Sequence, residues 1–72
     1  MKSRLHINEV AQLFAVTPRT VYYWVERFQL ETRDARLSRR AIRQIIALYP
    51  TLQYRRAAVW ERMQRLRQEF GA

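Results

Sequence analysis

The hydrophobic positions near the start of the chain have the spacing of a short helix over about residues 9–14. Val10, Ala11 and Phe14 fall on one side of such a helix, and Asn8 precedes it as the expected N-cap. A tight turn follows before the next hydrophobic run begins. The first predicted element is therefore a short amphipathic helix that ends in a turn.

A second helix is predicted over about residues 18–28, directly after this turn. Thr17 can cap it, and Pro18 at its first position gives up no hydrogen bond. The hydrophobic residues that gather on one side of it are Val21, Trp24, Val25 and Phe28. Two short helices joined in this way form a helix-turn-helix, which can present its second helix to a DNA major groove.

The hydrophobic pattern breaks over residues 30–37 and resumes in a third predicted helix. The break is short and polar, so we expect a loop or a rudimentary hairpin there. Ser38 can cap a helix over about 39–49, and Pro50 lacks the amide needed to continue it. The stripe that this helix would bury consists of Ile42, Ile45, Ile46 and Tyr49.

A fourth helix is expected from a cap at Thr51 to about Phe70, where Gly71 would stop it. Its hydrophobic stripe has coiled-coil spacing and consists of Leu52, Val59, Met63, Leu66 and Phe70. Two interpretations stay open: the stripe is a dimerisation seam, or the helix folds onto its own domain. Trp60, on the flank of the stripe, is expected to be buried in either case.

These elements predict an all-α, or nearly all-α, fold. A helix-turn-helix core would span residues 1–50, and a C-terminal helix would span 51–72. The chain has 72 residues, and a chain of this size buries only about 60% of its unfolded surface. Stabilisation by a partner subunit or by DNA is therefore expected.

The charge of the chain indicates a polyanionic partner. There are 14 Lys and Arg against 6 Asp and Glu, which leaves a formal net charge of +8, and Lys2 is the only lysine. The planar guanidinium of arginine matches phosphate oxygens and guanine edges better than an ammonium group does. This composition favours nucleic acid over a membrane surface or an acidic protein as the partner.

Enzymatic and metal-dependent functions find no support in the residue pattern. Cysteine is absent, His6 is the only histidine, and no glycine-rich phosphate loop occurs. We therefore expect no enzyme activity, no cofactor and no metal. No apolar run approaches the roughly 20 residues that span a bilayer, so a cytoplasmic location is expected.

The residues expected to contact DNA lie on the second helix and in a basic segment after it. Arg19, in the first turn of the helix, could pair with a guanine edge or a phosphate. Tyr23 faces the groove more squarely than Tyr22, for which packing under the loop is an equal alternative. The full predicted set is Thr17, Arg19, Thr20, Tyr22, Tyr23, Arg27, Arg33, Arg36, Arg39 and Arg40. The alternative for the last four is an ordinary solvated charge run.

The second helix resembles the helix-turn-helix of the MerR superfamily, and within it the small excisionases and AlpA-type regulators of phages and mobile elements. The resemblance covers about residues 5–48 and rests on Val16-Thr17-Pro18-Arg19-Thr20-Val21-Tyr22-Tyr23-Trp24-Val25. It implies a fold of winged-helix type, whose wing would fall at 30–37 and is here reduced, and Ala15 stands where relatives often have glycine. In larger relatives a C-terminal helix forms an antiparallel dimer, so the resemblance favours a dimerisation role for the fourth helix.

The expected function is sequence-specific binding of double-stranded DNA, either as an excisionase-like protein or as a small transcriptional regulator in a bacterial cell. The resemblance implies a homodimer or a cooperative array on DNA, with an integrase or RNA polymerase as further partners. The alternative is a protein-interaction module of a phage or mobile element that inhibits or recruits a host protein.

Overall fold

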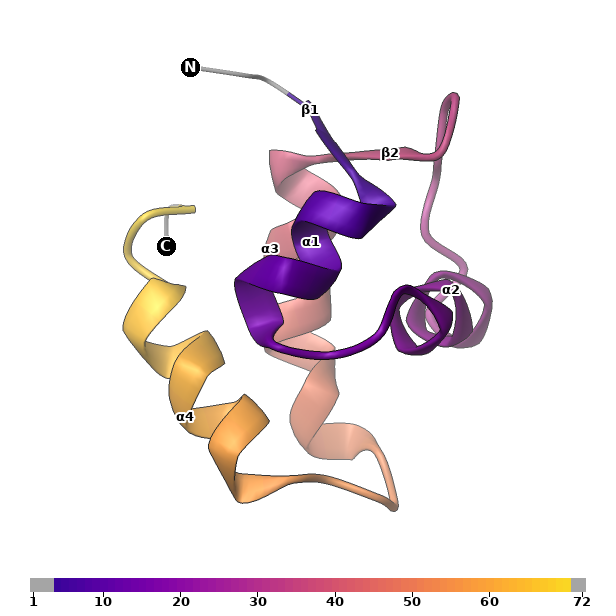
Figure 1. Cartoon of the computed structure of the whole chain (residues 1–72). Helices are drawn as coiled ribbons and strands as arrows, with labels where there is room; N and C mark the ends of the chain where they lie inside the picture. Colours follow the sequence, from indigo (N-terminus) through magenta and orange to yellow (C-terminus); the bar gives the residue numbers. More distant parts are fainter. Residues whose placement is uncertain (1–3, 71–72) are drawn as a thin grey trace.

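The computed structural model describes residues 4–70, which form a mostly helical fold with one small sheet (Figure 1). In chain order the elements are β1 (Arg4–His6), α1 (Ile7–Phe14), α2 (Pro18–Arg27), β2 (Arg36–Ser38), α3 (Arg39–Leu48), the 3-10 helix η1 (Tyr49–Thr51) and α4 (Ala57–Leu66). The prediction of a largely helical protein is confirmed.

The first helix begins earlier than predicted, because its cap is His6. The His6 Nδ1 accepts the backbone N–H of Asn8 at 3.0 Å, and the Glu9 carboxylate accepts the N–H of His6 at 2.9 Å. The prediction that Asn8 caps the helix is therefore wrong. His6 ends strand β1 in an extended conformation, so the sheet fixes the point at which the helix starts.

The second helix begins where the sequence predicted. The Thr17 hydroxyl oxygen accepts the N–H of Thr20 at 3.3 Å, and Pro18 occupies the first helical position. Val21 and Trp24 are buried, and the Trp24 ring meets the Phe14 ring edge-on at 5.9 Å. These contacts fix α2 against α1 across the tight turn that joins them.

The short polar segment after α2 forms a hairpin whose second strand pairs with the start of the described chain. β1 and β2 are antiparallel, with Leu5 opposite Leu37. Asp34 and Ala35 both have positive φ, 52° and 57°, as a type I′ turn requires. The Ala35 carbonyl also accepts the N–H of Ile7 at 2.8 Å, which ties the turn to α1. The expected rudimentary hairpin is present, whereas strand β1 was not predicted.

The third helix is capped as predicted, and the chain after it differs from the prediction. The Ser38 hydroxyl accepts the N–H of Ala41 at 3.1 Å. Thr51 does not cap α4; it lies in η1, where its hydroxyl donates to the Leu48 carbonyl at 2.6 Å. The fourth helix starts only at Ala57, because residues 52–56 form a loop. Gly71, the predicted stop, lies outside the described residues.

One hydrophobic core includes residues from all four helices, and the stripe of the C-terminal segment belongs to it. Leu52, Val59, Met63 and Phe70 are buried in this core, and Leu66 is half-buried against it. This packing favours the interpretation in which the helix folds onto its own domain, and the dimerisation seam stays an untested prediction. The stripe covers the chain's own interior, and the segment from 51 onward completes the core of the preceding residues.

Trp60 was expected to be buried, and this prediction is also wrong. Its side chain is 36% exposed, and its ring stacks on Tyr49 with centroids 6.5 Å apart. Trp60 follows the buried Val59, so it points about 100° away from the core-facing stripe.

Candidate nucleic-acid interface

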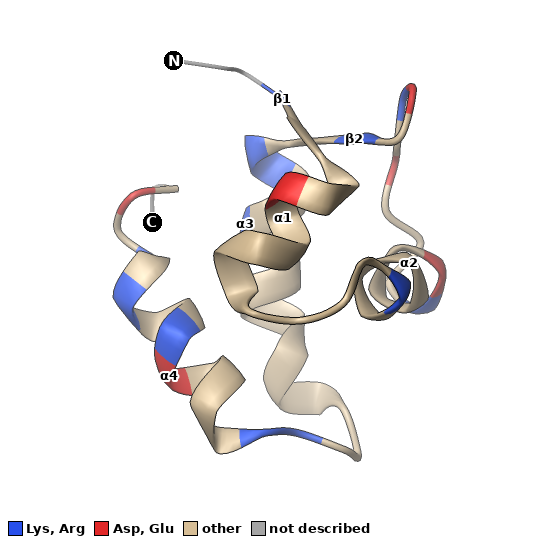
Figure 2. Ribbon diagram, in the orientation of Figure 1, with Lys and Arg blue, Asp and Glu red and all other residues tan. Residues whose placement is uncertain are grey.

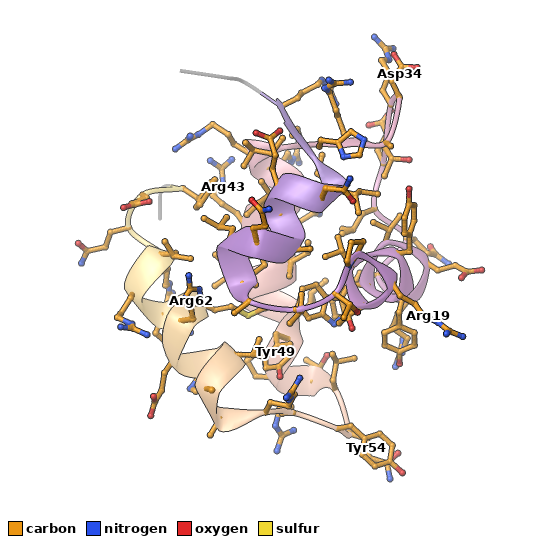
Figure 3. The ribbon with its side chains drawn as sticks, in the orientation of Figure 1. Arg19, Asp34, Arg43, Tyr49, Tyr54 and Arg62 are labelled. Atoms are coloured by element: carbon orange, nitrogen blue, oxygen red, sulfur yellow. The ribbon has the colours of Figure 1, made fainter. Side chains whose placement is uncertain are left out.

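The exposed face of α2 carries polar, aromatic and basic side chains opposite its buried face. Tyr22 and Tyr23 are 52% and 54% exposed, and Arg19 and Arg27 are also exposed. In Figure 3 the Arg19 side chain points away from the body of the molecule. The structure thus brings the predicted α2 residues to one accessible helix face.

The two threonines at the start of α2 interact with each other. The hydroxyl oxygens of Thr17 and Thr20 lie 3.1 Å apart, and that of Thr17 also accepts the Thr20 N–H. Thr17 is exposed and Thr20 is half-buried. Their first role is to form the cap, and the Thr17 side chain remains accessible at the helix start.

The structure divides the thirteen arginines, all within the described part of the chain, into two groups. One group donates hydrogen bonds to main-chain carbonyls and consists of Arg36, Arg39, Arg43, Arg55 and Arg62. Within residues 4–70, the guanidinium groups of the other eight make no hydrogen bond or ion pair; these are Arg4, Arg19, Arg27, Arg33, Arg40, Arg56, Arg65 and Arg67. The second group carries positive charge that is available to a partner.

The predicted basic cluster of the hairpin and α3 is divided by the fold. Arg33 and Arg36 lie at the hairpin, which follows α2, and Arg36 donates only to the Asp34 carbonyl at 3.5 Å. Arg39 donates to the Glu69 carbonyl and covers the Phe70 ring at 4.8 Å. Arg40 lines a groove between α3 and α4. Arg33 and Arg36 thus lie at the hairpin end of the short strand β2, and Arg39 and Arg40 lie at its other end, where α3 begins (Figure 2).

The loop of residues 53–56 adds a second basic and aromatic element beside α2. A concavity of about 450 Å³ separates Thr20 and Tyr23 of α2 from Tyr54 and Arg56 of the loop. Tyr54 is 85% exposed and lies on the same side of the view as Arg19 (Figure 3). Sequence analysis missed this element because it placed these residues inside a helix; the run Tyr54-Arg55-Arg56 was the available signal.

This loop is held in place by its own hydrogen bonds. Arg55 donates to the carbonyls of Pro50 and Leu52 at 2.9 and 2.7 Å, and the Tyr49 hydroxyl accepts the Arg56 N–H at 2.6 Å. The Arg56 guanidinium itself stays free. The loop therefore presents Tyr54 and Arg56 from a fixed backbone, which lowers the entropy cost of contacting a ligand.

Within the described range, two further features bear on the sequence-based expectations. No set of three or more His, Cys, Asp or Glu side chains among residues 4–70 is placed to hold a metal ion. None of the helices in that range is long and apolar enough to cross a bilayer.

Comparison with known proteins gave no match, either to a protein-family model, to a curated protein or to a solved structure.

Proposed function

We propose that the protein binds double-stranded DNA through α2. The hairpin and the 53–56 loop would contact the sugar-phosphate backbone of the DNA on either side of this helix. The observation that carries this proposal is the exposed face of α2, where Arg19, Tyr22, Tyr23 and Arg27 stand opposite the buried Val21 and Trp24. A helix held by one face and basic on the other fits the dimensions of a major groove.

Each element of this surface has a distinct role in the proposal. Arg19, in the first turn of α2, reads a base edge, because a guanidinium can pair bidentately with guanine. Arg33 at the hairpin and Arg56 in the loop contact phosphates, which position the protein without specifying sequence. The phenol hydroxyls of Tyr23 and Tyr54 donate hydrogen bonds to phosphates of the DNA backbone that lies between these two side chains.

The biological role that we propose is either excisionase-like control of recombination or regulation of transcription as a small DNA-binding regulator. The resemblance of residues 16–25 to MerR-type helix-turn-helix segments supports this setting. Both roles use the same surface, because each requires the protein to occupy or bend a DNA site. An integrase or RNA polymerase would then be the further partner, and several copies would bind cooperatively along the DNA.

Salt titration of binding to a labelled duplex tests the proposal. Because each phosphate contact contributes about −0.9, Arg33 and Arg56 should make the logarithm of the affinity fall with the logarithm of salt concentration with a slope of about −2 or steeper. Arg33→Ala and Arg56→Ala should each reduce the slope by about 1. Arg65→Ala, which removes the same charge from α4, is the matched control and should leave the slope unchanged. A flat salt dependence of the wild type would overturn the proposal.

A further inference from the structure

A groove between α3 and α4 forms a second accessible surface that α2 does not reach. Its volume is about 500 Å³, and its lining comes from α3, η1, α4 and the turn after α4. Ala47, Pro50 and Trp60 give it an apolar floor, and Arg40 and Arg67 line it from opposite sides. DNA binding through α2 makes no use of this groove.

Trp60 is the most informative residue of the groove. Its ring lies almost parallel to the buried Tyr49 ring, at an interplanar angle of 13°, and yet 36% of the side chain is exposed. Stacking on a buried ring holds the indole in one orientation. A fixed and accessible tryptophan beside small apolar residues is typical of an anchor point in protein interfaces.

The charges around the groove have one sign. Among residues 4–70 the guanidinium groups of Arg40 and Arg67 have no hydrogen-bond or ion-pair partner, while Arg43 donates to the Phe70 carbonyl at 2.9 Å. No Asp or Glu is among the described residues that line the groove, and Gln44 and Gln64 supply neutral polar groups. The groove is therefore complementary to a ligand that combines carboxylates with an apolar side chain.

We propose that this groove binds an acidic peptide segment of another protein. Carboxylates of the segment pair with Arg40 and Arg67, and an apolar side chain of the segment packs on Trp60 and Ala47. A peptide is favoured over duplex DNA as the occupant, because it can combine carboxylates with a hydrophobic side chain that packs on the exposed indole, whereas the DNA backbone has no such side chain. Since no residue of α2 lines the groove, the protein can hold DNA and the acidic partner together.

Titration of ¹⁵N-labelled full-length protein with a short synthetic peptide tests this proposal. The probe contains Glu and Asp around one Leu and one Phe, and its control has Ser in place of Leu and Phe. The probe should shift the indole N–H of Trp60 and the amides of Ala47 and Gln64, and the control peptide should bind at least about tenfold more weakly. Equal binding of the two peptides would overturn the proposal, since charge alone would then explain it.

Two pairs of variants separate the groove from the general charge of the protein. Ala47→Gln fills the floor and should lower the affinity for the probe about tenfold or more, while Ala58→Gln, on an exposed position of α4 outside the groove, should not. Arg40→Gln with Arg67→Gln should lower it about three- to tenfold, and Arg27→Gln with Arg65→Gln, the same charge change elsewhere, should have a smaller effect. Far-UV circular dichroism checks that each variant is folded.

Three other outcomes would overturn the proposal. The first is that the probe shifts the amides of α2 in place of those around Trp60. The second is that a DNA duplex shifts Trp60, Ala47 and Gln64 as strongly as the peptide does, which would assign the groove to DNA. The third is that sedimentation finds a dimer that Ala47→Gln dissociates, which would assign the groove to a second copy of the chain.

Discussion

At the scale of single residues, the turns of this protein place side chains where glycine is favoured. Four non-glycine residues within the described range 4–70 have positive φ: Ala15 at 58°, Gln29 at 54°, Asp34 at 52° and Ala35 at 57°. A left-handed conformation costs a residue with a Cβ atom about 1–2 kcal/mol, and Asp tolerates it better than Ala does. Both the turn between α1 and α2 and the hairpin turn therefore hold strain that the surrounding contacts overcome.

Replacing Ala15 with glycine should stabilise the protein. Ala15 is exposed, ends α1 with φ 58° and ψ 45°, and its N–H bonds to main-chain carbonyls that glycine would also reach. We expect Ala15→Gly to raise the free energy of unfolding by about 0.5–1 kcal/mol, after the greater freedom of glycine in the unfolded chain is subtracted. Ala47→Gly, on the exposed side of α3, should lower it by about 0.5–1 kcal/mol. Urea titration, monitored by circular dichroism, measures the free energy of unfolding of both variants. A destabilised Ala15→Gly variant would contradict the left-handed conformation of Ala15.

Arg19 should contribute to sequence preference as well as to affinity. Its guanidinium is exposed, free of internal partners and located in the first turn of α2. Arg19→Ala should weaken binding to a selected site by about 1–3 kcal/mol and relax the preference at one base pair. Selection of binding sites from a random library, followed by anisotropy titrations on the selected and a scrambled duplex, provides the measurement. Equal losses on both duplexes would reduce Arg19 to a phosphate contact.

At the scale of elements, the helices differ in what fixes their ends. The helices α2 and α3 start at the hydroxyl caps Thr17 and Ser38, whereas α4 starts at Arg56 without a side-chain cap. The helix α4 therefore depends on its docking against the rest of the chain. One such contact is the hydrogen bond from Arg62 Nε to the Leu13 carbonyl at 2.6 Å, which joins α4 to the last turn of α1.

Removing this contact should destabilise the protein measurably. The Arg62 side chain satisfies one of the carbonyls that the C-terminal end of α1 leaves unpaired. Arg62→Ala should lower the free energy of unfolding by about 1–2 kcal/mol, since the donor of this hydrogen bond is a charged guanidinium. Arg65→Ala, one turn further along α4 and without an internal partner, should change it by less than about 0.5 kcal/mol. Equal thermal midpoints for the two variants would show that α4 docks without this bond.

At the scale of the whole molecule, the C-terminal segment completes a core that α1, α2 and α3 leave open. Val59, Met63 and Phe70 are at most 5% exposed, and Arg39 and Arg43 fasten the turn that carries Phe70. A small domain has little stability in reserve. The hydrophobic stripe of the C-terminal segment, which has coiled-coil spacing, therefore packs against the core of its own chain.

The free protein is expected to sediment as a monomer at micromolar concentration, and Met63 should be essential to its fold. Met63 is 0% exposed. Met63→Gln would place a polar amide in the core and remove packing contacts, and together these effects should lower the free energy of unfolding by about 2–5 kcal/mol. Leu66→Gln, at a half-buried position of the same helix, should cost less. Circular dichroism of both variants beside sedimentation of the wild type provides the check. A dimeric wild type with a folded, monomeric Met63→Gln variant would support the seam interpretation.

The sequence by itself determined the start of α2 and α3, the burial of Val21 and Trp24 and of the α3 stripe, and the polar face of α2. These features depend on residues within about four positions of one another, such as Thr17 with Thr20 and Ser38 with Ala41, so the local pattern is sufficient to predict them. The same local reasoning placed Arg19 and Tyr23 on the exposed side of α2, whereas it left open whether Tyr22 packs under the loop.

Only the tertiary structure decided which arginines are free, where α4 begins and what covers its apolar stripe. Arg62 meets Leu13 across 49 positions and Arg39 meets Glu69 across 30. An arginine on a polar helix face has the same sequence pattern whether its guanidinium binds a distant carbonyl or faces solvent. Likewise, pairing with β2 defines His6 as the cap of α1, and the bond between Tyr49 and Arg56 holds residues 53–56 out of the helix. Such contacts join segments that are distant along the chain, so their partners are fixed only when the whole core has packed.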